Sequence, residues 1–146
     1  MVCGKDQPTN DFIKTEKFEV LGDEIEASIT VRVCLRCNEE VWDENLERAN
    51  QKSIYDKYRR KLNLLLPEEI KAIRDHYGLS QKSFAKLLGF GDKTITRYEN
   101  GSIQDRSHDL LMRLMDSKEC FITAWNVQKG QLSPDDISRV EIILNS

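Results

Sequence analysis

The feature that most constrains the fold of this 146-residue chain is residues 79–101, LSQKSFAKLLGFGDKTITRYENG. Ser80 can cap the start of a helix with its side-chain oxygen. Apolar residues then recur at the spacing of one helical face: Phe84, Leu87 and Leu88. Ala85 carries only a methyl group, so a second helix can cross closely there, and Gly89 comes where the first helix must stop. The stretch therefore predicts a short helix followed by a tight turn.

A second short helix is expected directly after the turn. Asp92 can cap it, and Asn100-Gly101 ends it. Ile95 and Tyr98 fall on its inner face. Its outer face is then polar and carries Lys93, Thr94, Thr96 and Arg97. Two helices of this kind predict a helix-turn-helix.

A polar outer face suits the major groove of DNA, which admits one α-helix and displays hydrogen-bond acceptors. Because Lys93 and Arg97 are four residues apart, they point the same way, and both are expected to contact base edges. Asp92 is a candidate acceptor for a cytosine amino group. The complete DNA-binding set, including residues for phosphate contacts, is Gln81, Lys82, Asp92, Lys93, Thr94, Thr96 and Arg97. The alternative is a helical hairpin of an unrelated bundle, with its basic side chains merely solvated.

The segment resembles the phage-repressor (Cro/C1 or XRE) helix-turn-helix, and residues from about 55 to 121 resemble the C-terminal half of MqsA/YgiT-type antitoxins. The shared stretches are PEEIKAIRDHYGLSQ, TRYENG and LLMRLMDS. The resemblance implies base contacts at Lys93 and Arg97 and a phosphate contact at Gln81. Lys93 stands where better-known members carry an amide side chain, so their operator sequence cannot be assumed for this chain.

The N-terminal half is predicted to be β. From Glu24 to Val33 the odd positions are apolar and the even positions polar, which is typical of a half-buried strand. Gly22-Asp23 separates this strand from a shorter alternation and predicts a hairpin with a tight turn. The strand runs into Cys34-Leu35-Arg36-Cys37, a zinc-knuckle arrangement that places two thiolates on one turn.

A second cysteine pair is incomplete. Cys3 resembles its second half, but the first cysteine would lie one residue before Met1. The MqsA/YgiT resemblance implies two such pairs around one structural zinc, so this chain matches three of the four ligands: Cys3, Cys34 and Cys37. An earlier natural start, a decayed site and a different fourth group all stay open. The other interpretation is a turn with small buried residues and no metal.

Charge is distributed unevenly along the chain. The net charge of −3 argues against a general nucleic-acid coat and for local positive charge. Residues 78–101 carry four basic against two acidic side chains, whereas residues 1–33 carry four basic against seven acidic ones. We therefore expect DNA at the C-terminal half and another partner at the N-terminal half. With no apolar run of membrane-spanning length, we expect no membrane partner and a cytoplasmic protein.

Catalysis has no candidate site in this sequence. A thioredoxin-like oxidoreductase would place its Cys-x-x-Cys motif in a βαβ unit, and no such pattern follows here. Cys120 is interpreted as a small buried residue, and His76 and His108 as surface or packing residues. An enzyme is therefore not expected.

The predicted fold class is α+β. It comprises a small zinc-knuckle-like β-hairpin domain over residues 1–42, a linker helix over 43–66, and an all-α, five-helix, repressor-like domain over 67–146. Four residues of the last domain are expected to close its core and to supply a dimer surface: Leu110, Leu111, Leu114 and Met115.

The sequence thus predicts a homodimeric, sequence-specific regulator of double-stranded operator DNA. By resemblance it is the antitoxin of a type II toxin–antitoxin pair, which represses its own operon and binds a toxin through its N-terminal half. The alternative is an interaction module that neutralises or adapts a partner without DNA binding.

Overall fold

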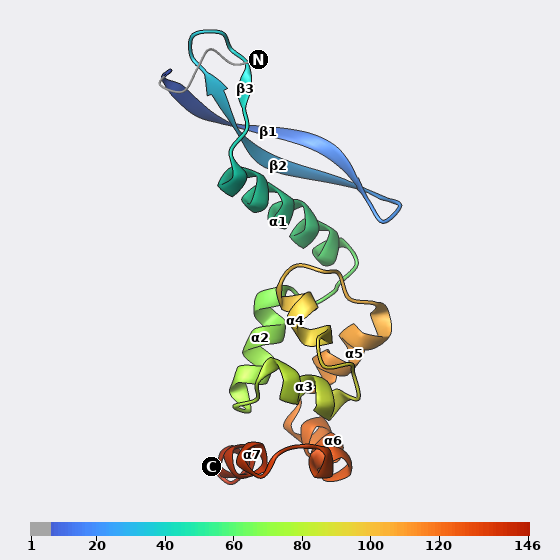
Figure 1. Ribbon diagram of the computed structural model, residues 1–146. Coiled ribbons are helices and arrows are strands. Elements are labelled where there is room, and N and C mark those ends of the chain that lie inside the picture. Colours follow the sequence, from blue (N-terminus) through green and yellow to red (C-terminus); the bar gives the residue numbers. More distant parts are fainter. Residues whose placement is uncertain (1–6) are drawn as a thin grey trace. The chain divides into compact units, whose positions relative to one another are not determined.

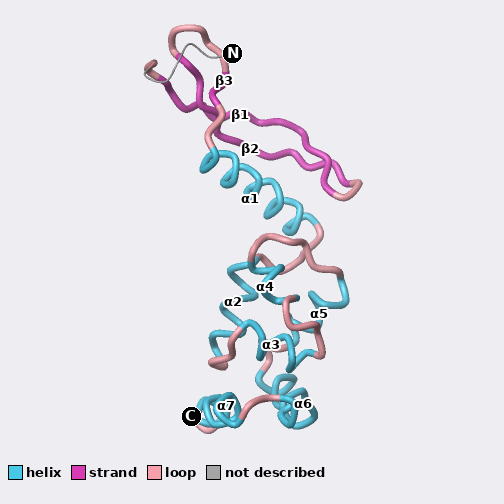
Figure 2. The backbone as a smooth tube through the Cα atoms, in the orientation of Figure 1, coloured by secondary structure: helices cyan, strands magenta, loops and turns pink. Residues whose placement is uncertain are grey.

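The computed structural model describes residues 7–146 and shows an α+β chain, as predicted (Figures 1 and 2). An antiparallel sheet of order β1-β2-β3 comes first, built from Thr9–Val20, Asp23–Cys34 and Glu40–Val41. Helices follow: α1 (Glu44–Lys61), α2 (Pro67–His76), α3 (Gln81–Leu88), α4 (Thr94–Glu99), α5 (Arg106–Leu114), α6 (Lys118–Gln128) and α7 (Pro134–Leu144), with a 3₁₀ turn η1 (Lys129–Gln131) before α7. The described residues up to Leu62 form one compact unit, and residues 63–146 form another. No helix in the described range is both long and apolar enough to cross a membrane.

The first unit is built on a long β-hairpin. Val20 pairs with Asp23, so the turn consists of Leu21 and Gly22, which have φ angles of 48° and 87°. Two positive φ angles match the twist of the flanking strands, and glycine accommodates the second without strain. The predicted hairpin is confirmed, and its turn lies one residue earlier than the sequence indicated. Along β2 the alternation buries Ile25 and Ala27.

Helix α1 packs along β2 because β3 is too short to cover that edge of the strand. The side-chain amide of Asn50 donates to the Thr30 carbonyl at 2.7 Å and accepts from the Thr30 amide at 2.9 Å. Lys61 Nζ donates to the Glu24 carbonyl at 3.1 Å further along β2. These side chains satisfy backbone groups that an open strand edge would leave to another chain. The helix predicted as a linker is thus part of the sheet unit (Figure 1).

Asp43 determines where α1 begins. Its Oδ1 accepts the Leu46 amide at 2.9 Å, and its Oδ2 pairs with Arg32 Nη1 at 2.9 Å. The Leu46 N–H group and the Arg32 guanidinium both lower the pKa of the Asp43 carboxyl. One carboxylate therefore caps the helix and ties it to β2.

The second unit has a single hydrophobic core. It is centred on one fully buried residue from each of its six α-helices: Ile70, Phe84, Ile95, Met112, Phe121 and Val140. Tyr77 stacks on Phe121 with ring centroids 3.5 Å apart. Burial of about 1.5–3 kcal/mol per large apolar side chain holds these short helices together, since helices of six to eleven residues are not stable alone.

Two predictions about this unit are wrong. It contains six α-helices rather than five, because α5 ends at Leu114 and Ser117 then caps α6 with its side chain. The prediction of which α5 residues face the core is also only partly right. Met112 and Met115 are buried three residues apart, whereas the leucines expected beside them are exposed: Leu110, Leu111 and Leu114. On a helix that buries residues 112 and 115, these leucines fall outside the core stripe.

Two glycines in one turn give a matched test of this unit. Gly89 ends α3 with a φ of 76°, and an added Cβ would meet only Gln128 Nε2 at 3.9 Å. Gly91 lies outside the left-handed region. We expect Gly89→Ala to lower the free energy of unfolding by about 1 kcal/mol through backbone strain, and Gly91→Ala to change it by less than about 0.5 kcal/mol. Urea unfolding followed by circular dichroism measures both; equal losses would contradict the assigned role of Gly89.

Candidate nucleic-acid interface

Helix α3 begins and ends at the residues that the sequence indicates. Ser80 Oγ accepts the Ser83 amide at 3.0 Å, which satisfies a donor of the first turn. Gly89 ends the helix in the left-handed conformation, and its amide bonds back to the Lys86 carbonyl at 3.1 Å. The chain then leaves α3 in a tight turn.

Helix α4 begins later than predicted, and the prediction that Asp92 caps it is wrong. The Thr94 amide donates to the Gly91 carbonyl at 3.0 Å, so the chain makes one more turn before α4 starts. Lys93 is then the N-cap residue, without a side-chain cap. Asp92 instead faces α3, with its Oδ2 3.9 Å from Lys82 Nζ.

The two sides of α4 differ strongly in exposure. Ile95 is fully buried, whereas Lys93 and Arg97 are exposed. Among the described residues, neither of these two cations has an ion-pair partner. Thr94 is partly buried at the start of the helix. The outward cations are therefore available to an anionic ligand.

Thr96 is not on the outer face to which the sequence assigned it. Its hydroxyl donates to Gln81 Oε1 at 2.9 Å, and Gln81 Nε2 donates to Glu99 Oε1 at 3.2 Å. Thr96 and Gln81 are both partly buried. This chain of hydrogen bonds joins the first residue of α3 to the middle and the end of α4.

An ion pair fixes the far end of α4. Arg74 on α2 donates to Glu99 through Nε at 2.7 Å and Nη2 at 2.8 Å, and the two side chains are only 11% and 7% exposed. A third bond runs from Arg74 Nη1 to the Leu79 carbonyl at 3.1 Å, just before α3. The Glu99 carboxylate raises the pKa of Arg74 further. One guanidinium therefore holds α2, α4 and the start of α3 together. The two residues are 25 positions apart, so local sequence patterns did not indicate this pair.

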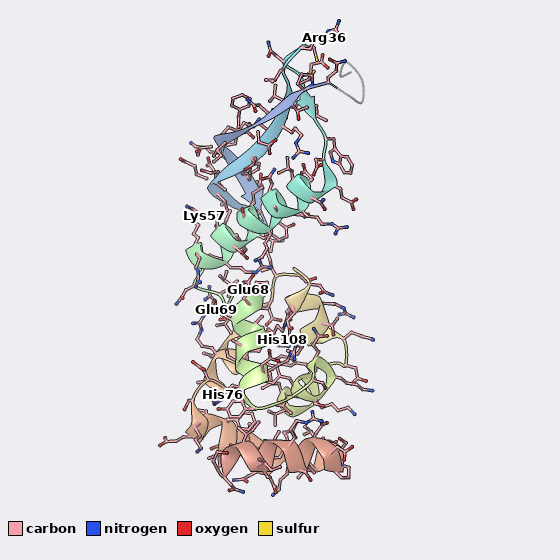
Figure 3. All side chains as sticks on the ribbon, turned by 90° about the vertical axis from the view of Figure 1, so that its left-hand side faces the viewer. Arg36, Lys57, Glu68, Glu69, His76 and His108 are labelled. Carbon is pink, nitrogen blue, oxygen red and sulfur yellow. The ribbon has the colours of Figure 1, made fainter. Side chains whose placement is uncertain are left out.

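His108 supports α4 from another side, where the sequence offered only a surface or packing role. Its Nδ1 lies 2.6 Å from the Tyr98 hydroxyl, and its ring stacks on Phe90 with centroids 3.8 Å apart. Burial and the Asp105 carboxylate raise the pKa of Tyr98. Figure 3 shows His108 inside the helical unit, and the contacts identify it as a packing residue between α4, α5 and the turn.

The cysteine turn lies between β2 and β3 in the first unit. The Cys34 amide donates to the Glu39 carbonyl at 2.9 Å, and the Asn38 amide donates to the Cys34 carbonyl at 2.8 Å, with Asn38 at a φ of 60°. Cys34 is buried and Cys37 is partly exposed. Cys3 lies outside the described residues, and residues 7–146 contain no cluster of three potential metal ligands. Two of the three predicted thiolates thus lie on one turn of the sheet unit.

The chain is thus an α+β protein with a cysteine turn in its sheet unit. In its helical unit, α4 exposes two cations and is held by side chains of α2 and α3. Comparison with models of protein families matches residues 1–120 to the family described as the antitoxin component of a bacterial toxin–antitoxin system, MqsA. The chain belongs to this family. The match covers the sheet unit and the helices through the first part of α6. No curated protein matches the chain.

The Arg74–Glu99 pair can be tested by removing one partner. Arg74→Met leaves the Glu99 carboxylate buried without its cation, so we expect the free energy of unfolding to fall by about 3 kcal/mol. The double variant Arg74→Met/Glu99→Met should recover part of that loss. Lys129→Met, which breaks an exposed pair with Glu141, is the control and should cost under about 1 kcal/mol. Urea unfolding measures all three; an equally small effect at Arg74 would contradict its assigned role.

Proposed function

We propose that α3 and α4 form an XRE-type helix-turn-helix, and that the chain is a sequence-specific DNA-binding repressor of its own operon. The observation that carries this proposal is the asymmetry of α4. Its inner side is held by the Arg74–Glu99 pair and by Gln81, while Lys93 and Arg97 are exposed. A rigid helix that presents cations suits the major groove.

We assign different roles to the predicted DNA-binding residues. Lys93 and Arg97 contact base edges, while Lys82 and Thr94 contact phosphates. Gln81 Nε2 uses one N–H group on Glu99, so its second N–H group serves a phosphate. Thr96 orients Gln81 and does not contact a base. Asp92 restrains Lys82 until DNA competes for that cation.

The second proposed function is neutralisation of a toxin through the first unit, and membership of an antitoxin family supports it. Two copies of the chain bind one operator, since repressor-type helix-turn-helix domains read two half-sites about one DNA turn apart. The exposed leucines of α5 supply an apolar surface for such a pair. Leu110, which is 54% exposed, and Leu114 lie on the same face of the helix.

Zinc binding at the cysteine turn completes the proposal. Cys34 and Cys37 supply two thiolates, and Cys3 with a fourth group supplies the remainder. We expect about one zinc ion per purified chain by elemental analysis. Cys34→Ser and Cys37→Ser should each lose it, whereas Cys120→Ser, in the helical unit, should retain it. A metal-free wild-type chain, or zinc retained by both turn variants, would contradict this role.

DNA binding is tested at the two outward cations. Lys93→Ala and Arg97→Ala should each weaken binding by about 1–3 kcal/mol, because each removes a contact to a base edge. Fluorescence anisotropy with a labelled duplex from upstream of the gene, against a scrambled duplex, measures affinity and specificity. Lys118→Ala, an exposed cation on α6, is the matched control and should bind as the wild type does. Unchanged operator preference in both α4 variants would contradict the proposal.

A further inference from the structure

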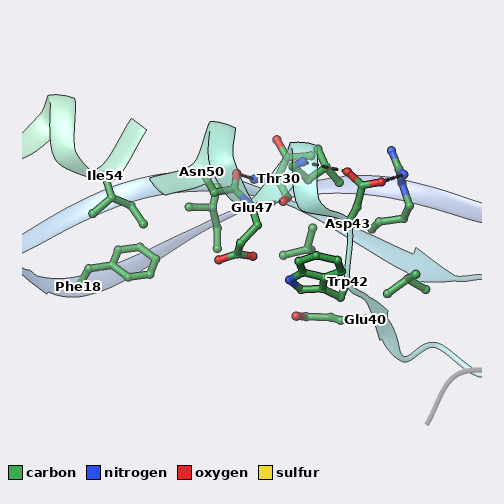
Figure 4. Close-up of a pocket in the computed structure, with 13 residues that line it drawn as sticks. Phe18, Thr30, Glu40, Trp42, Asp43, Glu47, Asn50 and Ile54 are labelled. Carbon is green, nitrogen blue, oxygen red and sulfur yellow. Dashed lines mark hydrogen bonds and ion pairs between the residues drawn. The ribbon is translucent and has the colours of Figure 1, made fainter. Parts of the chain in front are cut away.

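The first unit contains a groove between its strands and α1 (Figure 4). The cavity has a volume of about 300 Å³. Its apolar lining includes Phe18 from β1, Ile29 from β2, and Leu46 and Ile54 from α1. All four are partly buried, so the groove continues the small core of this unit to the surface. A cavity of this size accommodates one or two side chains of a partner.

Trp42 lies at one end of the groove, between β3 and α1 (Figure 4). It is 72% exposed although it is the largest apolar side chain in the first unit. A tryptophan beside an apolar cavity is a typical anchor of a protein interface, because it buries much area with little loss of conformational entropy. Its exposure in the isolated chain therefore indicates a surface that a partner covers.

Carboxylates lie on the same side of the groove. Glu40 and Glu47 line it, and Figure 4 shows both beside Trp42. Glu40 is held by Lys14 at 2.9 Å, whereas Glu47 has no ion-pair partner among the described residues. The groove is lined by three carboxylates, Glu40, Asp43 and Glu47, against one cation, Arg32, which pairs with Asp43. The surroundings of Trp42 are thus negative.

We propose that this Trp42 groove binds a basic segment of the partner toxin; the proposal rests on the toxin binding proposed above. A lysine or arginine of that segment lies over the indole ring of Trp42, where the negative face of the ring attracts a cation. Its charge pairs with Glu47, and an adjacent apolar side chain enters the groove. The groove then recognises two neighbouring residues of the toxin. Trp42 and Glu47 bind the cationic residue, and the apolar cavity binds the other.

The charge of this surface distinguishes the toxin from other occupants. A second copy of the chain would bring the same excess of carboxylates and oppose like charges across the interface. DNA is excluded by the same repulsion. A basic protein partner is attracted instead, and its association is faster and salt-dependent.

The test uses the full chain and the purified protein encoded beside its gene, with binding measured by isothermal titration calorimetry. We expect Trp42→Ala and Glu47→Lys each to weaken binding at least about tenfold. Glu47→Gln should reduce the dependence of affinity on salt concentration. The matched controls are Leu21→Ala, an exposed apolar residue at the hairpin turn, and Glu19→Lys, an exposed carboxylate outside the groove; both should bind within about twofold of wild type.

The possible results distinguish the role of the Trp42 groove from toxin binding as such. Full affinity in both groove variants would overturn the Trp42 groove while leaving toxin binding intact. Loss of affinity only in Trp42→Ala would overturn the cationic occupant. If the wild-type chain fails to bind the neighbouring protein, toxin binding itself fails and the groove with it. Circular dichroism and DNA binding of the variants show that the folded chain is otherwise unchanged.

Discussion

The buried pairing of Arg74 with Glu99 is the interaction on which the position of α4 depends. Helix α4 is only six residues long, which is too short to form or to keep its orientation by itself. The two-point bond from Arg74 fixes its end, and the bond to the Leu79 carbonyl fixes the start of α3 relative to it. Gln81 and Thr96 continue this network between the two helices. The cations of α4 thus project from a rigid base, which a specific DNA contact requires.

In the sheet unit, side chains of a helix stabilise an open strand edge. Its short strand β3 leaves most of one edge of β2 without a strand partner, and α1 covers that edge through Asn50 and Lys61. The same arrangement leaves a groove where β3 ends and α1 begins, with Trp42 at its margin. The junction that completes the fold is therefore also the place where we propose that a partner binds.

Local patterns predicted much of this protein. The caps at Ser80 and Gly89 depend on neighbouring residues, and the structure confirms them. The alternation of β2 is confirmed only in its first part, because every residue from Ile29 to Val33 is partly buried. The cap at Asp92 was wrong because the Thr94 amide closes a turn first, which periodicity does not reveal. The prediction that the leucines of α5 close the core was wrong, because an apolar residue on a helix can belong either to a core or to an interface. Partners such as Arg74 and Glu99, or Asn50 and Thr30, lie 20 or more residues apart and meet only in the folded chain.

We propose that the α3–α4 face binds DNA while the sheet unit remains available to a toxin. Amide NMR spectra of the full chain, recorded as the duplex from upstream of its gene is added, test this most directly. We expect stoichiometric shifts concentrated in residues 81–97, with the amides of residues 7–50 unmoved. Shifts confined to the sheet unit, or no shift at saturating duplex, would contradict it.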